Sequence, residues 1–157
     1  MTETLGEHRW LQRLVGEWTT ESEAESESGG APAKYTGTES VRSVGGVWVV
    51  CDGRGDMGDG QLTVTVMSLG YDPGRRRFVG TFIGSMMTDL WIYDGELDGD
   101  VLTLHTEGPS YTTPGARAKY LDTIELRGDD HRILTSRYQG DDGEWHQFMT
   151  AHYRRVR

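Results

Sequence analysis

The chain has little of several features that mark particular protein classes. It has one cysteine, Cys51, among 157 residues, so an intrachain disulfide is excluded, as suits a reducing compartment. No apolar run approaches the roughly 20 residues that a membrane helix needs. The N-terminal segment lacks the basic and then apolar stretches of a signal peptide. We therefore expect a cytoplasmic protein with no membrane partner.

Positive charge is also scarce. Lys and Arg number 16 against 25 Asp and Glu, so the formal net charge is −9. Because an acidic surface repels phosphate backbones, we expect no nucleic acid partner. The one basic cluster, Arg75 to Arg77, follows Asp72-Pro73-Gly74 and is typical of a solvated turn.

Glycine, in contrast, is abundant. Of the 22 glycines, five follow an Asp, at 52-53, 59-60, 94-95, 98-99 and 142-143, in pairs that separate short apolar segments. Such pairs supply the positive φ angles of tight hairpins, so the composition favours a β meander. Near the N-terminus, an apolar face from Leu5 to Val15 predicts a short helix over about 5–14. Thr4 and Glu7 would form its capping box, and Gly16 would end it.

Ten short segments rich in β-branched and aromatic residues predict strands. They are 17–26, 35–44, 46–51, 62–69, 77–83, 88–93, 101–106, 120–126, 132–138 and 145–153, with 46–51 a continuous run that we expect to be buried. Short connections make sequential strands antiparallel neighbours. An open sheet of ten strands leaves two unpaired edges, so we expect closure. The prediction is an all-β, single-domain antiparallel barrel over residues 1–157, with a short N-terminal helix.

The aromatic residues bear on what such a barrel contains. There are five Trp and seven Tyr. Aromatic rings inside a barrel either fill it as a core or line a pocket, and both alternatives stay open from the residues alone. Since about ten strands enclose more space than side chains readily fill, we favour a pocket for a small hydrophobic or planar molecule. Trp91, Met149, Tyr153 and a histidine are the candidate lining residues.

A second set of candidates is polar. His105, Glu107 and Arg137, with Asp89 and Tyr111, lie in or beside predicted strands. If they point inward, they could anchor a ligand or act as acid and base, as in an isomerase or cyclase of secondary metabolism. If they point outward, they belong to a solvated strand face.

The histidines do not predict a metal site. His146 and His152 lie six residues apart on one predicted strand, roughly 20 Å at the strand rise, so they cannot share an ion. We predict no cofactor. A single histidine could still be an axial ligand of haem, which stays an alternative.

Several segments resemble a known family. Gly16-Glu17-Trp18 resembles the G-x-W signature of calycins, in which the Trp packs across the closed end of the barrel beneath a basic side chain of the last strand. The other matching segments are 8–18, Gly70-Tyr-Asp-Pro73, 80–88, Leu90-Trp-Ile-Tyr93, Thr106-Glu-Gly-Pro109 and 142–149. Together they resemble the bacterial family catalogued as domain of unknown function 1579. The resemblance implies a calycin-like barrel with Arg154 or Arg155 on Trp18, and it implies no established activity.

The last predicted strand partly resembles the last strand of two further groups of barrels. Fatty-acid-binding proteins hold a carboxylate with an Arg and a Tyr two residues apart; this chain keeps Tyr153 but has Ala151 in place of the Arg. Nitrobindin-like barrels bind haem through a histidine near the C-terminus, a part that His146 or His152 could take. A ligand-binding barrel is therefore the first hypothesis, with an enzyme and a haem barrel as alternatives. Whether the chain forms a homodimer stays open.

Overall fold

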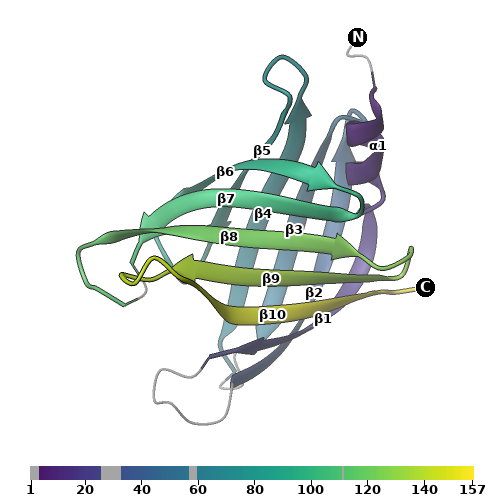
Figure 1. Ribbon diagram of the computed structural model, residues 1–157. Coiled ribbons are helices and arrows are strands. Elements are labelled where there is room, and N and C mark those ends of the chain that lie inside the picture. Colours follow the sequence, from purple (N-terminus) through teal and green to yellow (C-terminus); the bar gives the residue numbers. More distant parts are fainter. Residues whose placement is uncertain (1–3, 26–32, 57–59, 111) are drawn as a thin grey trace.

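The chain forms a closed antiparallel β-barrel with one short helix (Figure 1). The computed structural model describes residues 4–25, 33–56, 60–110 and 112–157, so most of the predicted 26–33 loop and Tyr111 lie outside the described residues. The elements are α1 (Gly6–Gln12), β1 (Gly16–Ala24), β2 (Ala33–Val44), β3 (Trp48–Asp56), β4 (Leu62–Asp72), β5 (Arg77–Gly84), β6 (Trp91–Asp98), β7 (Val101–Pro109), β8 (Arg117–Leu126), β9 (His131–Gln139) and β10 (Trp145–Arg155).

Each strand pairs with its neighbours in sequence, and β1 also pairs with β10, which closes the barrel. Because the number of strands is even, the closing pair is antiparallel like all the others. In Figure 1, β6 to β10 lie across the view in front of β1 to β5, which stand more upright. The predicted fold class, a single closed antiparallel barrel of ten strands with a short N-terminal helix, is therefore confirmed.

The helix α1 is shorter than predicted, and its cap differs. It begins at Gly6 after Leu5, and the ring Nδ1 of His8 accepts the Leu5 N–H at 3.0 Å. The predicted capping box of Thr4 and Glu7 is therefore wrong: the helix starts one residue later, and His8 takes the position of the acidic residue. Among the described residues, no helix has the length and apolar character needed to cross a membrane.

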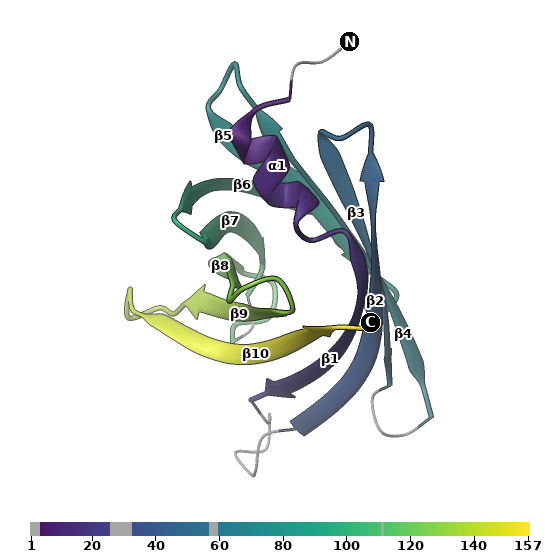
Figure 2. The same cartoon turned by 90° about the vertical axis from the view of Figure 1, so that its right-hand side faces the viewer.

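One end of the barrel is closed by α1, which lies across it (Figure 2). Trp10, Leu11 and Leu14 are buried against the core, and the Trp18 side chain is only 1% exposed. The Arg155 guanidinium lies 4.3 Å from the centre of the Trp18 ring. It also donates hydrogen bonds to the carbonyl oxygens of Val15 at 2.7 Å and Arg13 at 2.8 Å. Of the two candidate arginines, Arg155 is thus the one that braces the closed end.

The strand β3 corrects another expectation. The segment 46–51 was expected to be continuously buried, but β3 begins at Trp48 and alternates between the two faces. Val49 and Cys51 point into the barrel, whereas Trp48 is 42% exposed on the outside and packs over Gly70. A barrel strand has one face toward solvent, so an apolar run on it does not imply burial on both sides.

Candidate functional site

A cavity of about 380 Å³ opens among the strand ends that lie away from α1. Its wall is mostly apolar and comes from seven strands, β4 to β10, and the segment before β6. Five aromatic rings and three methionines supply this wall: Phe82, Trp91, Tyr93, Tyr120, Phe148, Met67, Met87 and Met149. Such a wall suits an apolar or planar molecule, because flexible methionines adapt to its shape while the rings offer flat contact surfaces.

The Trp91 indole is held in place from three sides. It lies directly over Gly108, where a Cβ atom would come within 2.1 Å of the ring. The indole N–H donates to the Met87 sulfur at 3.0 Å. Tyr120 meets the indole edge-on at 5.1 Å between ring centres, and its hydroxyl donates to the Pro109 carbonyl at 2.5 Å. The aromatic wall is therefore built in advance of any ligand.

Polar groups lie deeper in the same cavity. The Tyr93 hydroxyl donates to a carboxylate oxygen of Asp122 at 2.5 Å, and Ser136 also hydrogen-bonds to that carboxylate. Burial raises the pKa of the Asp122 carboxyl, and these two hydrogen bonds only partly oppose the rise. Burial also raises the pKa of Tyr93, and the nearby Asp122 raises it further. The surface that Asp122 still exposes faces the cavity.

Thr106 adds a polar atom without a partner. Its side chain is 8% exposed and lines the cavity, and its Oγ1 has no hydrogen-bond partner among the described residues. A buried hydroxyl without a partner costs free energy. The charged residues of the lining are both acidic, Asp122 inside and Asp89 at the mouth; the described lining contains no Lys, Arg or His side chain.

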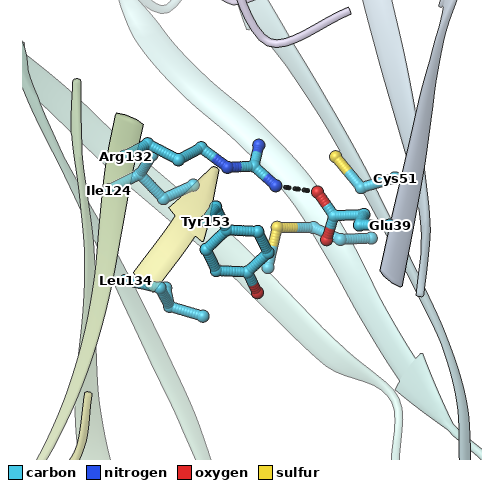
Figure 3. A pocket seen from close by; sticks show the side chains of 7 residues that line it. Glu39, Cys51, Ile124, Arg132, Leu134 and Tyr153 are labelled. Atoms are coloured by element: carbon cyan, nitrogen blue, oxygen red, sulfur yellow. Dashed lines mark hydrogen bonds and ion pairs between the residues drawn. The ribbon is translucent and has the colours of Figure 1, made fainter. Parts of the chain in front are cut away.

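A second, much smaller space of about 20 Å³ lies next to this cavity and shares Met67 and Leu134 with it. Figure 3 shows Arg132 reaching across it from β9 to form an ion pair with Glu39 of β2. The guanidinium lies 4.1 Å from the centre of the Tyr153 ring and 4.7 Å from that of Trp18. Burial lowers the pKa of Arg132 to about 10, so it stays charged at neutral pH.

The residues predicted as ligand contacts separate into two groups. Trp91 and Met149 line the larger cavity, and Tyr153 lines the smaller one. Three others lie on the outer face. There, His105 Nε2 is 2.8 Å from a Glu96 oxygen, and Arg137 donates to Gln147 at 3.0 Å. Glu107 is exposed.

His105, Glu107 and Arg137 therefore do not converge inside the barrel. Strand alternation explains this arrangement, because their neighbours Thr106 and Ser136 occupy the inward positions. The enzyme hypothesis required a buried, convergent set of these three residues, and we do not carry it further.

The histidines do not fit a haem held inside the barrel. His152 lies on the outer face, where His131 stacks on it with 3.0 Å between ring nitrogens. His146 lies at the rim, stacked on Tyr138 and 3.2 Å from an Asp142 oxygen, and does not line the cavity. His8 is a buried residue of α1, and both of its ring nitrogens are already hydrogen-bonded.

Sequence reasoning missed Asp122 and Thr106, although a signal for Asp122 was present. In β8 the inward positions read Tyr120, Asp122, Ile124 and Leu126, so one carboxylate interrupts an otherwise apolar face. For Thr106 the pattern held no such signal, because threonine is common on either face of a strand.

The comparisons with known proteins agree with this architecture. Rv2717c from M. tuberculosis superposes with a TM-score of 0.64 at 14% identity, covering 99% of this chain and 100% of its own. The S-type phycobiliprotein lyase CPES from Guillardia theta gives 0.62 at 14% identity, covering 95% of this chain and 92% of its own. The redesigned β-barrel mFAP1, bound to DFHBI, gives 0.51 at 15% identity, covering 94% and 99%.

At these identities the three structures show the fold alone. No curated protein matches the sequence. The family comparison is more specific, because one model spans residues 3–155, which is nearly the whole chain. This chain belongs to the family described as protein of unknown function (DUF1579).

Proposed function

We propose that this protein binds a small, largely apolar and planar molecule in the cavity at the open end of its barrel. The observation that carries the proposal is the 380 Å³ cavity with five aromatic rings and three methionines in its wall. A pocket of this size is within the range that small ligands occupy in proteins. Trp91 and Met149 are the sequence-predicted residues that would contact the ligand.

The similar structures support the proposal at the level of the fold. The redesigned barrel mFAP1 is bound to DFHBI, so a barrel of this architecture can hold a small molecule. The wall of the present cavity gives the more direct support, because Gly108 and Met87 position the Trp91 indole without any ligand. A wall that is already ordered loses little entropy when a ligand binds.

Binding is tested by titrating the purified protein with Nile red, a neutral planar dye, and following dye emission and Trp quenching. We expect saturable binding that Met149→Trp abolishes, because the larger ring occupies the cavity. Thr150→Trp, its neighbour on the outer face, is the matched control and should bind the dye normally. Native mass spectrometry of freshly purified protein shows whether a cellular ligand is retained. The absence of saturable binding, or equal binding by both variants, would overturn the proposal.

A further inference from the structure

The charges in and around the cavity narrow the class of ligand. Asp122 lies inside and Asp89 at the mouth, and the described lining supplies no cationic side chain. The chain as a whole carries a formal charge of −9. An anionic ligand would therefore enter a negative field and reach a carboxylate, both of which oppose binding.

The buried arginine does not change this conclusion. Arg132 pairs with Tyr153 across the β9–β10 ladder, which places an arginine and a tyrosine side by side inside the barrel. Its guanidinium, however, is ion-paired with Glu39 and lies between the Trp18 and Tyr153 rings. The positive charge is thus already compensated, and the space beside it measures only about 20 Å³.

Aromatic faces and a buried carboxylate together favour the opposite charge. A cation within about 6 Å of an aromatic ring is attracted by its negative face, and the attraction grows when water is excluded. The cavity wall offers the rings of Trp91, Tyr120 and Phe148, with Asp122 deeper inside.

We propose that the ligand is a planar aromatic molecule carrying a protonated amine, with its ring system against Trp91 and Phe148 and its ammonium group against Asp122. This inference rests on the proposed function and names the ligand class of the same cavity. The Tyr93 and Ser136 hydroxyls, which already hydrogen-bond to Asp122, hold the carboxylate in position for the ammonium group.

The test compares three naphthalene probes with the same ring and different charges: naphthylmethylammonium, naphthalenemethanol and naphthoate. Each is titrated against the Nile red complex of the full chain, and its displacement of the dye gives its affinity. We expect the ammonium compound to bind about tenfold more tightly than the neutral alcohol. The carboxylate should be the weakest of the three. Equal affinities, or tighter binding of the carboxylate, would overturn the inference.

The variant Asp122→Asn locates the effect in the cavity. It keeps the side-chain shape and removes the charge, so it should weaken the ammonium compound about tenfold and change the alcohol by a factor of about two at most. Asp98→Asn removes the same charge from an exposed position at the far end of β6 and should leave both affinities unchanged. If both variants weaken the ammonium compound equally, the overall charge of the protein is the cause, and the assigned carboxylate is wrong.

Phe148→Leu is a second variant in case Asp122→Asn does not fold. It keeps an apolar side chain but removes a ring face, so it should weaken the ammonium compound more than the alcohol. Equal weakening of both would show that the ring contributes only apolar contact and would count against the inference. Failure of Nile red to bind would instead overturn the proposed function itself, so the two failures are distinguishable.

Discussion

The two ends of the barrel use the same ten strands in different ways. At the closed end, α1 covers Trp18, Arg155 ties α1 to the last strand, and the side chains fill the interior. At the open end, the strands enclose about 380 Å³ that protein atoms do not fill. Sheet geometry alone therefore does not decide whether a barrel of this size is filled; the side chains and the helix decide.

The polar groups differ between the two ends as well. Near the closed end, Arg132 has Glu39 as its counter-ion, and Arg155 donates to backbone carbonyls. At the open end, Thr106 Oγ1 has no partner among the described residues, and burial holds the pKa of Asp122 above its usual range. The difference suggests that the closed end supplies stability while the open end keeps the Asp122 carboxylate available for binding.

The largest expected effect concerns Trp18. Trp18→Ala removes a fully buried ring from the filled end, and we expect a loss of about 3–5 kcal/mol in the free energy of unfolding. Phe148→Ala truncates a ring beside existing empty space and should cost only about 1 kcal/mol, because it creates little new cavity. Urea unfolding followed by far-UV circular dichroism measures both. Equal losses would contradict the division of roles between the two ends.

The ion pair between Glu39 and Arg132 should show the next largest effect. Glu39→Gln leaves a buried guanidinium without its counter-charge, which typically costs about 3 kcal/mol. The double variant Glu39→Leu, Arg132→Met replaces both partners with apolar side chains and should recover most of that stability. The same urea experiment, arranged as a double-mutant cycle, measures the difference. If Glu39→Gln is as stable to urea as the wild type, the ion pair between Glu39 and Arg132 does not stabilise the filled end of the barrel.

The smallest effect is expected for Asp122. Because its pKa is higher in the folded protein than in the unfolded chain, the folded state binds the proton more tightly. Stability is therefore highest below the unfolded pKa of about 3.9 and falls as pH rises through the folded pKa. Asp122→Asn removes this loss and should therefore be more stable than the wild type at neutral pH.

Thermal unfolding at several pH values measures that difference. The gap between Asp122→Asn and the wild type should close as the pH falls below about 4, where the wild-type carboxyl becomes protonated in both states. Asp98→Asn, at an exposed position, provides the control. If the wild type instead becomes more stable relative to Asp122→Asn as the pH rises from about 4 to neutral, the folded protein stabilises the ionised Asp122 carboxylate. That outcome would contradict the prediction.

Much of the fold was predictable because strands leave a local signal. Alternation and turn residues placed all ten strands, and the unpaired edges of an open sheet implied closure. The family resemblance added the bracing of Trp18 by a basic residue of the last strand, which Arg155 provides. The cap of α1 was mispredicted because the helix starts one residue later, so the N-cap N–H belongs to Leu5 and the residue in position to accept it is His8 rather than Glu7.

The sequence by itself determined the barrel, its strand order and the aromatic residues available to its interior, because these follow from short-range patterns and short connections. Only the tertiary structure decided which end is filled and which polar residues lie inside. His105 and Thr106 are adjacent in sequence, yet one contacts Glu96 outside and the other lines the cavity. Which of two adjacent side chains points into the barrel depends on the register across several strands. A shift of one residue would move every inward side chain of a strand to the outer face.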